Sequence, residues 1–348
     1  ISAILKVNLL WIPIPDGVDL FFVLSGFLIG SIFIKSLQEN KQENTMQIAR
    51  DFWIMRWFRT LPNYYWITII VFCMNGFHMP FKNLIFMQNF YKNSANPFPE
   101  TWSLAVEEWF YILLPFIAFL FLKLFNSLLK SMMFTVVFFL ILSCFFRIIF
   151  FENTVHHDFS VYLTTIRNIV LTRLDSIAVG LFGACMHQYF PAIFFSSKIK
   201  KLFLGFMIVI SYTVYTNVFC MYKIISIDWF NWNFSSLIMA CGVLMMFPFL
   251  LAIKIKNGYF NKIITLTSNI SYSMYLIHKT ILLNVFLLIY LNFKIIPIEV
   301  LVPVYFIVLY LMSYLNYTFI EKYFIKLRYV LVDMLRKNSL NRVNKISA

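Results

Sequence analysis

Two acidic side chains stand inside strongly apolar stretches of the sequence. Asp19 lies near the start of GVDLFFVLSGFLIG (17–30), and Glu107 lies within ETWSLAVEEWFYILLP (100–115). A carboxylate in such surroundings is energetically expensive unless it faces a polar interior, so it is a functional candidate by default. Because carboxylates can act as general acids or bases, Asp19 and Glu107 are candidate catalytic residues.

The acid at Glu107 is followed directly by a second one, Glu108. Thr101 or Ser103 can cap the helix predicted here, so both acids fall in its first two turns, where negative charge also complements the helix dipole. Adjacent residues point in different directions, and the spacing of four places Tyr111 on the same face as Glu107, together with Ser103. From the residues alone, a dipole role and a chemical role both stay open.

Two arginines, Arg56 and Arg59, lie three residues apart in RWFRTLP (56–62). This spacing places both guanidinium groups on one face of a helix. Two forked donors side by side suit a phosphate or pyrophosphate group, which makes the pair a candidate substrate-binding site. The alternative is that both are ordinary positive anchors at the inner end of a membrane span.

A third group of charges opens the stretch RLDSIAVG, in which Arg173 and Asp175 lie two residues apart. Both are expected well inside the membrane boundary, where charges pair with each other or with charges on other helices. Because they do not share a helix face, we expect Arg173 to meet an acid elsewhere, with Asp19 and Glu107 as candidates. A structural ion pair and a substrate contact are both compatible with this pattern.

A polar stripe of Ser271, Tyr275 and His278 follows the spacing i, i+4, i+7 within an otherwise apolar stretch. The histidine is a candidate catalytic group and the other two are candidate substrate contacts, although a lone intramembrane histidine is often a hydrogen-bonded packing residue. Neither the five isolated cysteines nor His156 and His157 have the spacing of a metal site, so we expect no metal and no tightly bound cofactor.

Composition predicts an all-α, polytopic bundle of membrane-spanning helices. Of the 348 residues, 61% are hydrophobic and only 13% are charged, against about 25% charged in soluble proteins. Searching for stretches of about 20 apolar residues gives a partial first span at 4–14 and nine full spans. The full spans are 18–34, 60–76, 104–122, 131–150, 166–187, 202–221, 234–253, 269–291 and 300–320.

The distribution of basic residues predicts the orientation of these spans. Twenty of the 29 Lys and Arg residues fall on one side of the predicted membrane and four on the other, which assigns the first side to the cytoplasm. The net charge of +14 therefore reports topology and contact with anionic lipid, and does not indicate nucleic-acid binding. Residues 1–320 are expected to form one membrane domain, and 321–348 a basic, amphipathic cytoplasmic tail. Arg147, near the outer end of its span, can extend its side chain to the interface.

Five sequence motifs, spread in order over nearly the whole chain, resemble those of the acyltransferase 3 family. They are GVDLFFVLSGFLI from Gly17, the Arg56–Arg59 pair followed by Leu61–Pro62, WSLAVEEWFY from Trp102, RLDSIAVG from Arg173 and ISYSMYLIH ending at His278. Glu107 occupies the acid position of the family motif that WSLAVEEWFY resembles, whereas Glu108 lies at a more variable one. Glu321 is a weak match to an acid that closes the family's pattern, because the proline expected to follow it is missing.

The resemblance implies an integral-membrane O-acyltransferase of the bacterial inner (cytoplasmic) membrane. Members of this family acylate cell-surface glycans such as polysaccharide and lipopolysaccharide. The implied donor substrate is acyl-CoA, with acetyl-CoA expected, and the implied acceptor is a surface glycan or its lipid-linked precursor. Arg56 and Arg59 are then expected to hold the donor phosphates, while Asp19, Glu107 and Arg173 shape the polar cavity on the acceptor side.

One expected feature of the family is missing from the sequence. The family places a basic residue and a histidine, the favoured catalytic base, on a first span before the GVDLFF motif. Residues 1–16 contain no histidine, and the first one in the chain is His78. We expect either that the N-terminal helix is truncated or that the base is lost. The second case predicts a non-catalytic or degenerate relative, for example a transport or lipid-carrier-binding protein, unless His278 replaces the base.

Overall fold

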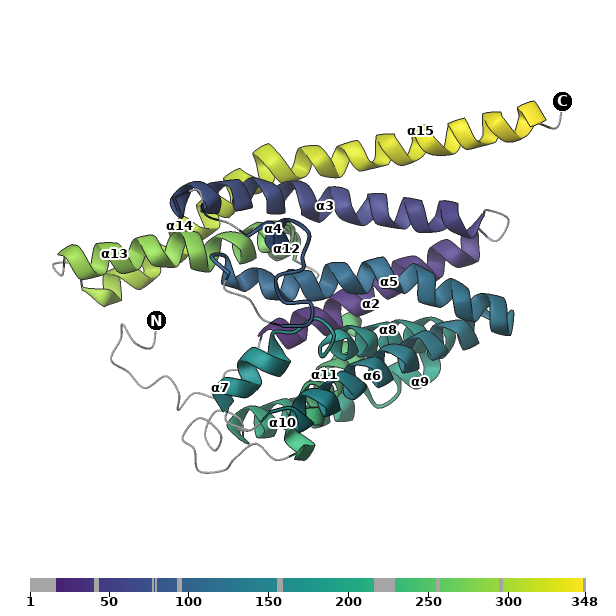
Figure 1. Cartoon of the computed structure of the whole chain (residues 1–348), viewed down its shortest axis with the longest axis horizontal. Helices are drawn as coiled ribbons and strands as arrows, with labels where there is room; N and C mark the ends of the chain where they lie inside the picture. Colours follow the sequence, from purple (N-terminus) through teal and green to yellow (C-terminus); the bar gives the residue numbers. More distant parts are fainter. Residues whose placement is uncertain are drawn as a thin grey trace. The chain divides into compact units, whose positions relative to one another are not determined.

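The structure is a computed structural model that describes residues 17–40, 44–76, 78, 80–92, 96–154, 159–215, 229–254, 257–293 and 297–346. Every regular element within these ranges is a helix, which confirms the expected all-α fold (Figure 1). The partial first span predicted at 4–14 lies outside the described residues, as do His156 and His157.

Within the described part of the chain, six helical stretches are long and apolar enough to cross a membrane, as expected for a multi-pass protein. They are Gly17–Glu39, Pro99–Phe125, Leu128–Glu152, Trp229–Ala252, Gly258–Tyr290 and Glu299–Lys337. The other three predicted spans, 60–76, 166–187 and the described part of 202–221, correspond to helices that are shorter or less apolar. Two of these have 16 and 17 residues, below the about 20 that cross the hydrocarbon core. The number of nine spans therefore stays a prediction.

The described residues form two compact units. Unit 1 takes its residues from 17–40, 85–92 and 102–254, and unit 2 from 44–84, 96–101 and 257–346. Each unit thus combines segments that are far apart in the sequence.

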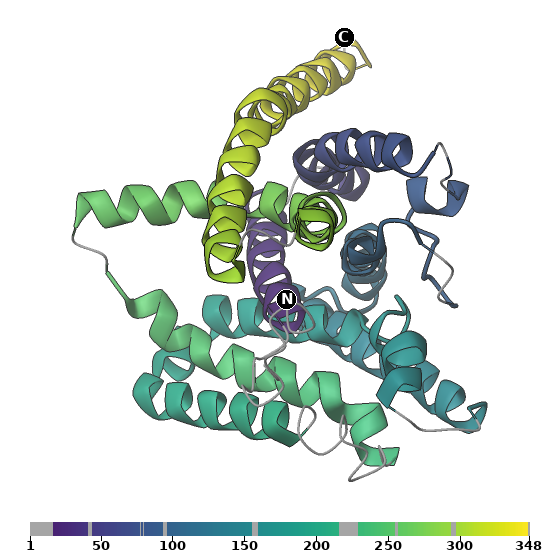
Figure 2. The same ribbon diagram turned by 90° about the vertical axis from the view of Figure 1, so that its left-hand side faces the viewer.

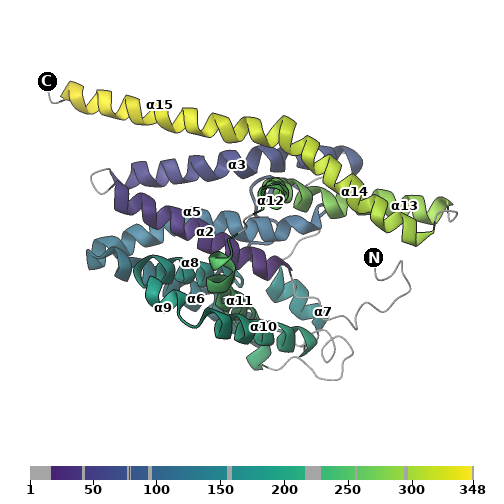
Figure 3. The ribbon, with the colours of Figure 1, turned by 180° about the vertical axis from the view of Figure 1, so that it is seen from behind.

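The described part of unit 1 contains nine helical elements, which place the charged residues of three sequence motifs. They are α2 (Gly17–Glu39), α5 (Trp102–Phe125), α6 (Leu128–Glu152), α7 (Phe159–Tyr162), the π-helical η3 (Leu163–Arg167), α8 (Leu174–Tyr189), α9 (Pro191–Phe195), α10 (Lys198–Val214) and α11 (Trp229–Ala252). Helix α2 packs on α8, and α10 lies beside α11, as Figure 3 shows. The described interior of the unit is mostly apolar, and among its buried polar residues is a group of charged and hydroxyl side chains described below.

The contact between α2 and α8 depends on two glycines that let the backbones touch. A Cβ atom added to Gly26 would lie 1.9 Å from the carbonyl oxygen of Ile177, and one added to Gly180 would lie 2.2 Å from the carbonyl oxygen of Val23. No side chain fits at either position without moving backbone. Small residues at helix–helix contacts have this role in membranes, so the glycine in the middle of GVDLFFVLSGFLIG is needed for packing.

Replacing Gly26 by alanine is therefore expected to destabilise unit 1 by about 1–3 kcal/mol, because the added methyl group overpacks the contact. The matched control is Gly17→Ala on the same helix, since a Cβ at Gly17 meets nothing within 4 Å. Thermal unfolding of the two purified variants in detergent gives the comparison. Equal melting temperatures for both variants would show that the backbones of α2 and α8 lie farther apart than in the structure.

Unit 2 contains the remaining elements of the described chain. They are α3 (Thr45–Met74), α4 (Phe81–Leu84), the short 3₁₀ turn η2 (Pro99–Thr101), α12 (Gly258–Ile277), the π-helical η5 (His278–Leu283), α13 (Asn284–Phe293), α14 (Ile298–Asn316), the π-helical η6 (Tyr317–Glu321) and α15 (Lys322–Ile346). The run from α14 through η6 into α15 is continuous (Figure 2). The predicted boundary at residue 320 falls inside this run, and the separate tail stays a prediction.

Helices α3 and α15 run side by side along unit 2 (Figure 1). The carboxylate of Asp51 on α3 is buried and accepts hydrogen bonds from two arginines, Arg50 at 2.8 Å and Arg336 of α15 at 2.8 Å. Arg328 of α15 donates to the backbone oxygen of Met55 at 3.0 Å. These contacts hold the C-terminal helix against the segment of α3 that precedes the Arg56–Arg59 pair.

Candidate functional site

Asp19 and Arg173 form a buried ion pair within unit 1. Asp19 lies in the first turn of α2, and Arg173 directly precedes α8. The guanidinium group of Arg173 also lies over the ring of Phe22, 5.5 Å from its centre. The expectation that Arg173 meets an acid on another helix is confirmed, and of the two candidates the acid is Asp19.

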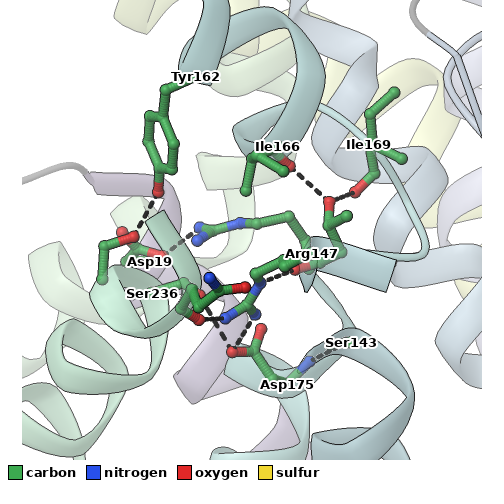
Figure 4. Close-up of polar contacts among 12 residues, drawn as sticks. Asp19, Ser143, Arg147, Tyr162, Ile166, Ile169, Asp175 and Ser236 are labelled. Carbon is green, nitrogen blue, oxygen red and sulfur yellow. Dashed lines mark hydrogen bonds and ion pairs between the residues drawn. The ribbon is translucent and has the colours of Figure 1, made fainter. Parts of the chain in front are cut away.

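A second buried ion pair joins Asp175 to Arg147 of α6 (Figure 4). Arg147 is only 2% exposed, so the interpretation of its side chain as reaching the membrane interface is wrong. Its Nε donates to the backbone oxygen of Thr172 at 2.8 Å, and another nitrogen donates to the backbone oxygen of Asn233. A guanidinium group with this many acceptors can stay charged in the interior, which the sequence pattern around Arg147 did not indicate.

Hydroxyl groups surround the two ion pairs. Ser236 of α11 donates to Asp175 Oδ2 at 3.0 Å, and the backbone N–H of Asp175 donates to Ser143 Oγ at 3.2 Å. The hydroxyl groups of Tyr162 and Ser235 bond to each other nearby, and burial raises the pKa of the Tyr162 phenol, so it stays neutral and able to donate. The result is a polar cluster of carboxylates, guanidinium groups and hydroxyls inside an apolar helix bundle.

Three buried oxygen atoms in this cluster have no hydrogen-bond partner among the described residues. They are Asp175 Oδ1, Ser176 Oγ and Asn233 Oδ1. A buried acceptor without a partner is energetically costly, so such atoms mark places where a water molecule or a ligand hydroxyl completes the site. The cluster therefore has free capacity to bind a polar group.

Glu107 belongs to a short chain of hydrogen bonds in unit 1. Tyr111 Oη donates to Glu107 Oε2 at 3.1 Å, which confirms that the two share a helix face, and the hydroxyl groups of Tyr111 and Ser25 of α2 bond to each other. Glu107 is partly exposed, whereas the neighbouring Glu108 is buried. Of the two adjacent acids, Glu107 is thus the one that is both linked to other polar groups and accessible.

In unit 2, Arg56 is half-buried and Arg59 is exposed on α3, one turn before a buried polar cluster. The cluster consists of Asn63, Ser273, Asn316 and Glu321: the amide of Asn63 donates to Glu321 at 3.3 Å, and Ser273 donates to Glu321 at 2.8 Å. The guanidinium group of Arg59 attracts the Glu321 carboxylate electrostatically. Glu321, which the sequence marked only weakly, is thus a buried acid that accepts hydrogen bonds from Asn63 and Ser273.

The predicted stripe on α12 and η5 is only partly brought together. Ser271 donates at 2.8 Å to the backbone oxygen of Ser268 on its own helix, and no described hydrogen bond joins it to Tyr275 or His278. Tyr275 and His278 do lie together: the ring centres are 5.5 Å apart, and His278 Nδ1 is 2.6 Å from the backbone oxygen of Tyr275. Tyr275 Oη also donates to the backbone oxygen of Glu100 at 2.7 Å, a residue that the sequence did not single out.

Among the described residues, no group of three or more His, Cys, Asp and Glu side chains lies close enough to hold a metal ion. The site residues instead fall into two sets, one in each unit. Asp19, Glu107, Arg173 and Asp175 belong to unit 1, and Arg56, Arg59, Ser271, Tyr275 and His278 belong to unit 2. Their roles in catalysis and binding stay predictions.

Three relatives of known sequence match parts of the chain. Over 128 residues it is 34% identical to "Peptidoglycan O-acetyltransferase OatA" of Listeria monocytogenes, covering 31% of this chain and 20% of that protein. Over 122 residues it is 33% identical to "Putative peptidoglycan O-acetyltransferase YrhL" of Bacillus subtilis, covering 28% and 18%. An uncharacterized protein of Haemophilus influenzae is 28% identical over 204 residues, covering 53% of this chain and 80% of the relative.

The chain thus spans about a fifth of the length of the two relatives with an assigned or putative activity. No solved structure matches it significantly. The family model described as "Acyltransferase domain" matches residues 10–324, which include every motif and both ion pairs. Since this match covers nearly the whole sequence, the chain belongs to the acyltransferase 3 family.

Proposed function

We propose that the chain is a membrane O-acyltransferase of the bacterial inner membrane that moves an acetyl group from acetyl-CoA to a glycan hydroxyl. Membership of the acyltransferase family supports the reaction class, and it is the observation that carries the proposal. The names of the Listeria and Bacillus relatives favour peptidoglycan, or its lipid-linked precursor, as the acceptor. In this reaction the acceptor oxygen attacks the thioester carbonyl and loses its proton to a base, and the coenzyme A thiolate leaves.

Arg56 and Arg59 are assigned to the phosphates of the donor. They lie three residues apart on α3, and both remain at least partly accessible. Guanidinium groups bind phosphate through parallel charge-assisted hydrogen bonds, and Glu321 attracts Arg59 from the buried side. The excess of basic residues on the predicted cytoplasmic face supports the entry of acyl-CoA from that side.

The buried cluster of unit 1 is assigned to the acceptor. A sugar offers several hydroxyl groups, and the unpartnered oxygens of Asp175, Ser176 and Asn233 can accept hydrogen bonds from such groups. Asp19 and Arg173 neutralise each other in the same unit, so they contribute a polar wall without net charge. A neutral polyhydroxylated ligand suits this balance better than an ionic one.

Two residues are candidates for the general base. Glu107 can accept a proton. It accepts a hydrogen bond from Tyr111, whose hydroxyl group is in turn hydrogen-bonded to that of Ser25. His278 can accept a proton at Nε2, because its Nδ1 faces a backbone carbonyl. The acceptor hydroxyl releases a single proton, so the two residues are alternatives for one role: Glu107 is the candidate base in unit 1 and His278 the candidate base in unit 2.

The proposed function is tested by expressing the chain in a bacterial strain whose own surface glycans carry no O-acetyl groups. Ester-linked acetate is released from the purified glycan with mild alkali and measured. We expect acetate above the level of the empty vector, together with loss of the acetyl group from acetyl-CoA supplied to membrane vesicles. A correctly inserted protein that transfers no acetyl group would favour a non-catalytic relative that binds a lipid carrier.

Replacing Glu107 by glutamine is expected to lower the rate of acetyl transfer by about 10²-fold or more, because an amide cannot take the proton from the acceptor hydroxyl. The matched control is the adjacent Glu108→Gln, which removes a buried carboxylate of the same helix and is expected to change stability more than turnover. Initial rates in membrane vesicles, normalised to the amount of folded protein, measure the difference. Equal losses in both variants would remove Glu107 from the list of candidate bases.

A further inference from the structure

Glu100 is a buried acid in η2, and both oxygens of its carboxylate accept hydrogen bonds from Thr280. The side chain is 4% exposed. Its Oε1 accepts the backbone N–H of Thr280 at 2.8 Å, and its Oε2 accepts the hydroxyl group of Thr280 at 2.7 Å. In addition, the backbone oxygen of Glu100 accepts the hydroxyl group of Tyr275 at 2.7 Å. Glu100 is therefore fixed to α12 and η5 at two places, one on each side of His278.

These contacts fall where the helix changes its hydrogen-bonding pattern. Residues His278–Leu283 are π-helical, between α12 and α13. A π-helical turn widens the backbone ladder by one residue and is often found at functional sites. The Glu100 carboxylate accepts an N–H from inside this turn, and Asn284 donates to the backbone oxygen of Thr280 at 2.9 Å. Side chains thus stabilise a turn that the backbone alone forms poorly.

His278 begins the π-helical turn, and the last turn of α12 offers its ring a backbone acceptor. Its Nδ1 lies 2.6 Å from the backbone oxygen of Tyr275. A carbonyl oxygen can only accept, so the proton of the neutral ring must be on Nδ1, and Nε2 carries the lone pair. No described residue donates to Nε2. Tyr305 donates to the backbone oxygen of His278 at 2.6 Å, which fixes the backbone on the other side.

We propose that Glu100 is the positioning residue for His278. By binding both the N–H and the hydroxyl group of Thr280, it holds the π-helical turn, and the turn keeps His278 in the tautomer whose Nε2 can take a proton. The inference rests on the proposed function, in which His278 is one of the two candidates for the base of acyl transfer. Glu100 does not touch the reacting atoms; it acts through Thr280 and the backbone of η5.

The variants that test this separate the two contacts. Glu100→Leu removes both acceptors at similar volume, and Thr280→Val removes only the hydroxyl donor, whereas Thr280→Ser keeps it. Glu152→Gln is the control, because Glu152 is an exposed acid at the end of α6 with no assigned role. If Glu100→Leu does not fold, Thr280→Val provides the same test with a smaller change.

The first readout is the tautomer of His278, measured by ¹⁵N NMR of protein labelled at its five histidines and assigned with the variant His278→Gln. We expect the Nδ1–H tautomer in the wild type, Thr280→Ser and Glu152→Gln, and a mixture of tautomers in Glu100→Leu and Thr280→Val. This measurement does not need catalysis. It therefore decides the positioning role even if the chain transfers no acetyl group, a result that would overturn the proposed function alone.

The second readout is acetyl transfer, separated into kcat and KM. Misplacing a base lowers kcat by about 10²-fold, so we expect this loss in Glu100→Leu, a smaller loss in Thr280→Val, and unchanged KM for acetyl-CoA. The double variant Glu100→Leu/Thr280→Val is expected to be no slower than Glu100→Leu, because both changes break the same contact between Glu100 and Thr280. Two results would overturn the proposal: a folded Glu100→Leu variant in which His278 keeps the wild-type tautomer, or a folded Glu100→Leu variant with the wild-type kcat. After either result, Glu100 would be a residue with a structural role only.

Discussion

At acetyl-CoA concentrations well below KM, the double variant Arg56→Ala/Arg59→Ala is expected to lose acetyl transfer almost completely while still inserting into the membrane. Both guanidinium groups lie on one stretch of α3, and neither is fully buried. Each hydrogen bond to a charged group contributes about 1.5–3 kcal/mol, so removing two phosphate contacts lowers kcat/KM by about 10²- to 10⁴-fold. The loss should appear in the KM for acetyl-CoA, because the phosphates lie far from the reacting carbonyl.

Two control variants make this result specific. Lys198→Ala/Lys200→Ala removes two exposed basic residues at the start of α10, on the face also predicted to be cytoplasmic, and is expected to keep full activity. Arg59→Lys keeps the charge but loses the forked geometry, so it should fall between the wild type and the double variant. If the double variant binds acetyl-CoA as the wild type does, the donor is held elsewhere and the arginines are membrane anchors.

Breaking the second buried ion pair is expected to have the largest effect on stability. In Arg147→Met the carboxylate of Asp175 stays in the interior with its cation removed. Removing one partner of a buried pair costs about 3–5 kcal/mol, because the remaining charge is uncompensated. Thermal unfolding in detergent should therefore show a large drop in melting temperature. The double variant Arg147→Met/Asp175→Asn should recover part of the loss, because it leaves no unpaired charge.

The matched control is an exposed ion pair in the same unit. Lys35 and Glu39 on α2 lie 3.7 Å apart, with side chains 68% and 62% exposed. Exposed pairs contribute about 0–1 kcal/mol, so Lys35→Met should leave the melting temperature nearly unchanged. If Arg147→Met changed the melting temperature as little as Lys35→Met, water would have to reach the pair between Arg147 and Asp175.

The parts of the fold that depend on local sequence could be predicted. Apolar stretches interrupted by charges mark the helices, and the spacing of four residues places Tyr111 against Glu107. The pairing of Arg173 with an acid followed from the cost of an unpaired charge at that depth. These predictions need only the period of a helix and the dielectric properties of a membrane.

The remaining contacts depend on packing between distant segments. Glu100 and Thr280 are 180 positions apart, and no pattern in the sequence relates them. Arg147 reaches Asp175 because α6 and α8 happen to face each other at this level, so its depth could not be judged from its place along one span. The π-helical turn at His278–Leu283 also escaped prediction, because the Glu100 carboxylate that accepts one of its N–H groups comes from a distant part of the sequence.

The glycine contact between α2 and α8 has a consequence for the alignment of the two helices. Asp19 precedes Gly26 by seven residues, and Arg173 precedes Gly180 by seven residues. Both intervals are close to two helical turns, or about 10 Å, so the charges meet at the same distance from the point where the backbones touch. The equal spacing in the two motifs therefore sets the register in which the two helices pair. A single residue inserted between Asp19 and Gly26 would rotate the carboxylate by about 100° away from Arg173, although every residue type in the motif would still be present.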